Sequence, residues 1–167
     1  IIEGTAEYTE MIPDTANGFI TKQHGAGIRD YIKSGERRLG AAAEIPMLEG
    51  HMTMDRDTWQ GLTRTPDSMF SLYYRSCILV YFFNHLDGDG KGTRFMKYMD
   101  AVYGEVKQTR EFFANPEVKR SPDGRFTYPQ SLTPPDFRNP FKHLGLLLDG
   151  RGYSDLMSEI ETKYKAE

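Results

Sequence analysis

Acidic side chains are the first feature of this sequence that could do chemistry. Glu3, Glu7 and Glu10 share one face of a helix predicted over residues 1–12, where an apolar stripe forms the other face and Pro13 ends the pattern. A carboxylate can bind a metal ion. Three glutamates on one helix face are also what a solvated surface looks like, and spacing alone favours that interpretation.

The same helix carries a family resemblance. The run Glu3-Gly4-Thr5-Ala6-Glu7-Tyr8 resembles the second active-site helix of the gluzincin zinc metallopeptidases. In that family an HExxH helix supplies two histidine ligands and a general base, and a later helix supplies a glutamate. The resemblance implies that Glu3 is the third zinc ligand, with the fourth position left to the activated water. It also implies that Glu7 does not bind the zinc itself but orients the residues that do.

A second match lies downstream, at Tyr73-Tyr74-Arg75-Ser76. This run resembles the Tyr-x-x-(Gly or Ser) element of gluzincin aminopeptidases and of related bacterial domains of unassigned function. The resemblance implies that the Tyr73 hydroxyl donates a hydrogen bond to the developing oxyanion. Taken singly, a tyrosine at this place is equally typical of a core. The two matches extend over roughly residues 1–105.

The HExxH motif itself is absent, because no histidine is followed by a glutamate and then by a second histidine four residues on. The four histidines are His24, His51, His85 and His143. The resemblance therefore implies that two zinc ligands and the general base lie upstream of Ile1. Zinc would belong to the full-length parent and not to this chain alone, since one carboxylate cannot hold the ion against water. The expected function is that of a C-terminal fragment of a zinc-dependent peptidase, which acts on a peptide or protein substrate and is not competent alone.

Two alternatives stay open. One is a non-catalytic helical module for protein interaction or peptide binding, and the other is a degenerate peptidase that only binds peptides. Residues 115–141 hold six prolines interleaved with aromatic residues, a pattern that cannot propagate a helix but can lie extended with its rings anchored on a surface. In the module interpretation this segment contacts another domain or protein. An HExxH helix encoded just upstream of Ile1 would favour the peptidase.

Composition excludes several other classes. The 167 residues carry 21 basic and 24 acidic side chains, a net charge of −3, so nucleic acid is not an expected partner. The most apolar run, residues 77–83, is too short to span a membrane, and Cys77 within it is expected to be a buried hydrophobe. The spacing of Asp87 to Gly92 is similar to that of an EF-hand loop, but Lys91 and Tyr98 replace required ligands, so a turn is predicted.

Two expectations concern the chain's surroundings. No signal peptide is visible, yet bacterial members of the resembled family are often exported, so an extracytoplasmic location is expected. Ile1 and Ile2 would pack against the missing catalytic helix. We therefore expect self-association through the exposed first helix.

Periodicity predicts the elements that position these residues. The predicted fold is mainly α-helical, a single domain over 1–167 with five to seven helices around a buried central helix at residues 66–86. Residues 1–114 would be the gluzincin-like helical half, 115–141 the extended Pro-rich segment and 142–167 the C-terminal helices.

Local signals place the remaining boundaries. The other predicted helices cover residues 28–39, a short segment carrying Trp59, residues near 95–102, residues 105–113, residues 141–148 and the C-terminus. Expected N-caps are Thr53 for the segment with Trp59, Thr65 for the central helix and Ser154 for the last helix. Gly61 is expected to end the Trp59 helix. Pro122-Asp123-Gly124 is a possible hairpin turn.

Overall fold

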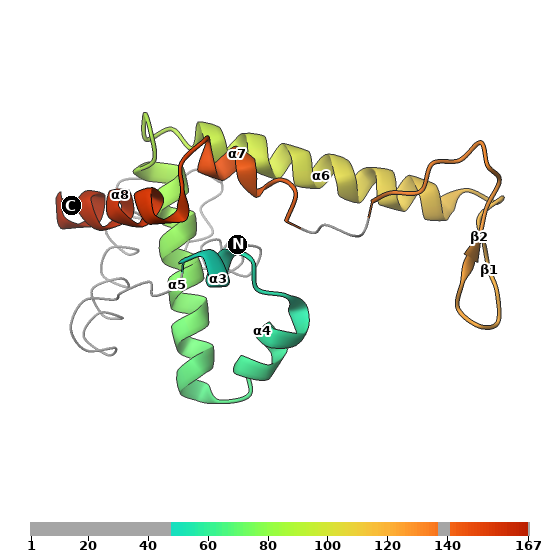
Figure 1. Ribbon diagram of the computed structural model, residues 1–167, viewed down its shortest axis with the longest axis horizontal. Coiled ribbons are helices and arrows are strands. Elements are labelled where there is room, and N and C mark those ends of the chain that lie inside the picture. Colours follow the sequence, from blue (N-terminus) through green and yellow to red (C-terminus); the bar gives the residue numbers. More distant parts are fainter. Residues whose placement is uncertain (1–47, 137–140, 167) are drawn as a thin grey trace, which may run out of the picture. The chain divides into compact units, whose positions relative to one another are not determined.

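The computed structural model describes residues 48–136 and 141–166, and within them the fold is mainly α-helical, as predicted (Figure 1). These residues form six helices and one two-stranded antiparallel sheet. The predicted helices at 1–12 and 28–39 lie outside the described residues, and so do Glu3 and Glu7. None of the described helices is both long and apolar enough to cross a membrane.

Contacts group the chain into two compact units. In its described part, unit 1 consists of residues 48–92 and 151–166, and unit 2 spans Thr93–Gly150. The single domain over 1–167 stays a prediction.

The core of unit 1 is helix α5, Pro66–His85. It begins where the sequence predicts, with Thr65 as N-cap residue and Pro66 in the first turn, where a missing amide hydrogen costs nothing. The Thr65 side chain, however, makes no capping hydrogen bond. The middle of the helix is buried on all sides, which confirms the predicted central helix. Its buried residues are Leu72, Tyr74, Ser76, Cys77, Ile78, Leu79, Val80, Tyr81, Phe82 and Phe83.

Two short helices precede α5, namely α3, Leu48–Met52, and α4, Arg56–Leu62. The predicted N-cap Thr53 is wrong. Asp55 caps α4, because its carboxylate accepts a hydrogen bond of 2.7 Å from the Thr58 amide, while the Thr53 hydroxyl donates to the Glu49 carbonyl. An ionised acceptor satisfies an orphan amide better than a hydroxyl does. The helix also continues through Gly61 and ends at Leu62.

Helix α8, Tyr153–Ala166, completes unit 1. Ser154 is not its N-cap, because the helix already begins at Tyr153. The Asp155 carboxylate accepts a hydrogen bond from the amide of Gly152, the residue directly before the helix. Leu156 and Ile160 are buried as predicted. The Tyr164 hydroxyl donates a 2.8 Å hydrogen bond to the Ile78 carbonyl of α5.

A buried ion pair also fixes the start of α8. The Arg151 guanidinium lies 2.9 Å from the Asp87 carboxylate and 2.6 Å from that of Glu159. Asp87 follows α5 in a turn whose glycines Gly88, Gly90 and Gly92 all adopt positive φ. Since Asp87 faces an arginine, the loop is a structural turn, in keeping with the sequence-based interpretation.

Unit 2 is built on helix α6, Thr93–Ala114. The prediction of two helices in this stretch is wrong, since a single helix of 22 residues runs through Gly104. After it, strands β1, Lys119–Arg120, and β2, Phe126–Thr127, pair as an antiparallel hairpin around the predicted Pro122-Asp123-Gly124 turn.

Helix α7, Leu144–Leu148, lies along α6 in Figure 1. It is shorter than the predicted 141–148 and ends at Asp149, which has a left-handed φ of 50°. Before the helix, Lys142 and His143 contact the Glu105 carboxylate of α6 at 2.8 and 2.9 Å. Both contacts hold the pKa of Glu105 below its usual value, with the Lys142 hydrogen bond as the largest cause.

Candidate functional site

Tyr73 is the one predicted site residue that the structure describes. It lies on α5 and is partly exposed, whereas its neighbour Tyr74 is fully buried. Its ring packs edge-to-face on Trp59 of α4, with ring centroids 5.5 Å apart. Because Glu3 and Glu7 lie outside the described residues, the predicted pairing of Tyr73 with a metal-binding carboxylate stays a prediction. Among the described residues no group of three or more His, Cys, Asp or Glu side chains could hold a metal ion.

A histidine and a serine lie close together where α3 meets α5. His51 Nε2 of α3 is 3.0 Å from Ser76 Oγ of α5, the spacing of a general base and its nucleophile. Ser76 is fully buried and His51 nearly so, and the Nδ1 atom of His51 has no hydrogen-bond partner in the described structure. A substrate cannot reach this fully buried hydroxyl, and no carboxylate of the described residues is hydrogen-bonded to the imidazole. The pair is therefore a polar link between α3 and α5.

Burial also decides the charge of this histidine. It lowers the pKa of His51 from 6.5 to about 4, and the nearby Arg75 guanidinium adds to the effect. The imidazole is therefore neutral at pH 7. No local pattern predicts this pair, because His51 and Ser76 are 25 residues apart and belong to different helices.

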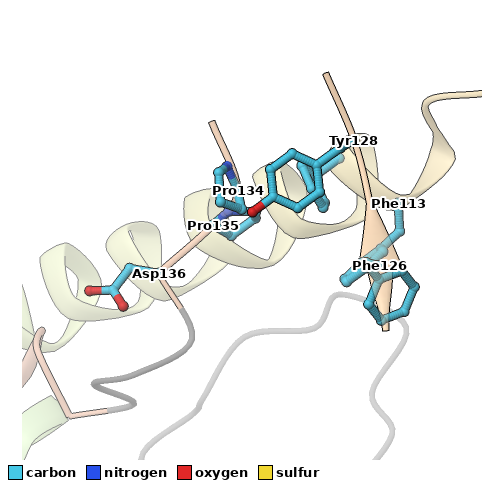
Figure 2. A pocket seen from close by; sticks show the side chains of 7 residues that line it. Phe113, Phe126, Tyr128, Pro134, Pro135 and Asp136 are labelled. Carbon is cyan, nitrogen blue, oxygen red and sulfur yellow. The ribbon is translucent and has the colours of Figure 1, made fainter. Parts of the chain in front are cut away.

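Unit 2 carries an open groove at the end of α6. Its volume is about 570 Å³, and it is lined by Phe112, Phe113, Phe126, Tyr128, Pro134, Pro135 and Asp136. Six of these seven residues are aromatic or proline. Figure 2 shows Tyr128 beside Pro134 and Pro135, with Asp136 toward one end and Phe113 and Phe126 toward the other.

Ring contacts hold the aromatic wall of the groove in place. Phe112 and Phe113 end α6, and each packs on a residue of the following segment: Phe112 meets Tyr128 edge-to-face at 5.2 Å, and Phe113 meets Phe126 at 4.8 Å. The β-hairpin supplies Phe126, so its turn fixes where this ring returns to the helix. Such ring pairs stabilise an arrangement beyond the apolar area they bury.

Much of this wall remains open to solvent. Phe113, Phe126 and Tyr128 are 41%, 44% and 41% exposed, although Phe112 behind them is buried. The Pro-rich pattern predicts rings anchored on a surface, and Phe126 and Tyr128 are two of them. That Phe112 and Phe113 provide the anchor is not predicted, because the sequence pattern places them only at the end of a helix.

The chain has no match among protein-family models, curated proteins or solved structures. What it can do is therefore inferred from the contacts, exposure and charge of its own side chains.

Proposed function

We propose that this chain is a protein-interaction module whose groove at the end of α6 docks an extended, proline-containing segment of a partner protein. The observation that carries the proposal is the groove's lining, in which three partly exposed aromatic rings stand next to two prolines. A contiguous exposed apolar surface of this kind is typical of interaction sites. The lining offers only one charged side chain, so shape and ring contacts must supply most of the recognition.

The chain's own prolines indicate what the groove accommodates. Pro134 and Pro135 lie beside Tyr128 in Figure 2 and continue the aromatic wall. Grooves lined by aromatic rings bind polyproline II segments because such segments are already extended and lose little conformational entropy on binding. A partner segment of the same chemistry could continue along this surface.

Fluorescence anisotropy with a labelled oligoproline peptide tests the proposal. Tyr128→Ala and Phe113→Ala should each weaken binding about tenfold, since central aromatic anchors dominate such interfaces. Phe113 comes from α6, so its substitution leaves the hairpin residues intact. Tyr103→Ala is the matched control, because Tyr103 is also on α6, is 69% exposed and does not line the groove.

Helical circular dichroism identifies any variant that has not folded. Absence of saturable binding by the unmodified protein would refute the proposal. Equal affinities for folded Phe113→Ala and Tyr103→Ala proteins would also refute it.

We also propose, as a second function, that the chain is the C-terminal fragment of a zinc peptidase. Its support is the resemblance at Glu3 and Tyr73, together with the partial exposure of Tyr73, which leaves part of this side chain accessible. In a parent protein with an upstream HExxH helix, Glu3→Ala should remove bound zinc. Tyr73→Phe should keep the zinc and lower kcat roughly a hundredfold. A coding sequence without HExxH upstream would exclude this second function.

A further inference from the structure

We propose that the groove selects partner segments in which an acidic residue lies next to the prolines, and that Arg120 forms an ion pair with this acidic residue. The inference rests on the proposed docking function and names the chemistry of the docked segment. It is carried by the position of one cation at the rim of the aromatic wall.

The hairpin register places Arg120 beside Phe126, one of the residues that line the groove. Arg120 is the direct cross-strand partner of Phe126, and directly opposed residues of an antiparallel pair extend from the same face. The Arg120 guanidinium carbon lies 5.9 Å from the centre of the Phe126 ring. Since Phe126 lines the groove, the exposed cation lies next to a residue of the binding surface.

Among the charged residues of the hairpin, Arg120 is the cation that is placed to bind an acidic residue of the partner. Arg125 is paired with Asp123 at 3.4 Å. Asp123 remains ionised, because hydrogen bonds from the Ser121 hydroxyl and from the Arg125 amide lower its pKa. Lys119 precedes Arg120 in the strand and so belongs to the opposite face. Among the described residues, Arg120 forms no ion pair with a carboxylate within 4 Å.

The two ends of the groove differ in charge. Phe126, beside which Arg120 lies, is toward one end, and the carboxylate of Asp136 is toward the other (Figure 2). A partner's acidic residue is therefore favoured at the hairpin end. Charge complementarity of this kind sets specificity and orientation more than total affinity.

Three labelled peptides with the same oligoproline core test the inference. One carries aspartates next to the prolines, one serines and one lysines. At low ionic strength the aspartate peptide should bind about three- to fivefold more tightly than the serine peptide, and the lysine peptide more weakly than both, as expected of an exposed ion pair. The preference should shrink as salt is added.

Substitutions then assign the preference to one residue. Arg120→Gln should abolish it, and Arg120→Glu should reverse it toward the lysine peptide. Lys97→Glu is the charge-matched control, because Lys97 is exposed on the same helix as Phe113 but about 24 Å away along it. This control should retain the preference for aspartate.

The outcomes separate the two proposals. Equal binding of the three peptides, or a preference that survives Arg120→Glu, would overturn the assignment of Arg120 and leave the docking function standing. If none of the peptides binds, both proposals fail.

Discussion

His51 is a buried residue that contributes to the pH dependence of the stability of unit 1. The unfolded chain binds a proton at this histidine below pH 6.5, whereas the folded chain does so only near pH 4. Stability should therefore be complete above pH 6.5 and decrease as the pH falls toward 4. The total loss should be about 3 kcal/mol, because each unit of pKa difference corresponds to 1.36 kcal/mol.

Urea unfolding between pH 7 and 5 measures most of this effect while the carboxylates are still largely ionised. His51→Gln keeps a neutral group facing Ser76 and should unfold with a flatter pH dependence than the unmodified protein. The same slope in both proteins would show that His51 is not the titrating group.

In the Asp87–Arg151–Glu159 cluster, Arg151 pairs with one buried carboxylate and one partly exposed carboxylate. The Asp87 side chain is 2% exposed and that of Glu159 is 30% exposed. Arg151→Met should cost about 3 kcal/mol, since it leaves a carboxylate buried without the guanidinium that faces it. Glu159→Gln should cost about 1 kcal/mol or less.

Chemical denaturation of the two variants checks this order. The prediction is contradicted if Glu159→Gln is the more damaging change.

At the scale of elements, two glycines should respond in opposite directions to the same substitution. Gly104 lies within α6, and a β-carbon built there meets nothing within 4 Å. Gly104→Ala should therefore stabilise unit 2 by about 0.5–1 kcal/mol, because alanine restricts the unfolded chain and favours the helix. Gly92 has a φ of +69°, and its β-carbon would lie 3.2 Å from the Asn84 side chain, so Gly92→Ala should destabilise.

Thermal unfolding of both variants tests the contrast. Equal shifts in Tm, or a lower Tm for Gly104→Ala, would argue against it.

Helix boundaries show which local signals can be predicted. The Thr65-Pro66-Asp67 start was correct because proline fixes its own φ and lacks an amide, whatever surrounds it. Predictions of cap residues are wrong where several candidates lie close together in the sequence, as with Thr53 and Asp55. The choice among them depends on which side chain reaches an unpaired amide, and spacing does not determine that.

At the scale of the molecule, a destabilising substitution in one unit should leave the hydrogen exchange of the other unit almost unchanged. Arg151→Met removes a contact made within unit 1 alone. Hydrogen exchange measured by mass spectrometry should therefore show faster exchange in α5 and α8, with little change in the α6 and α7 amides. A uniform increase across all four helices would mean that the chain unfolds as one cooperative body.

The candidate sites differ in how far the sequence could predict them. An extended Pro-rich segment with anchored rings follows from local chemistry, since proline stops helices and aromatic side chains seek contact. The groove itself required Phe112 and Phe113 to meet Tyr128 and Phe126 across a hairpin, and the His51–Ser76 pair required two helices to pack. Contacts of this kind depend on where distant segments return.

Local sequence patterns are enough to predict the helical class, the buried central helix and the hairpin turn, because periodicity, proline and glycine act on neighbouring residues. They do not predict that Arg120 lies beside the Phe126 ring, that Ser76 is fully buried or that Asp87 faces Arg151. Those outcomes depend on strand register and helix packing, which bring together side chains that no local pattern links.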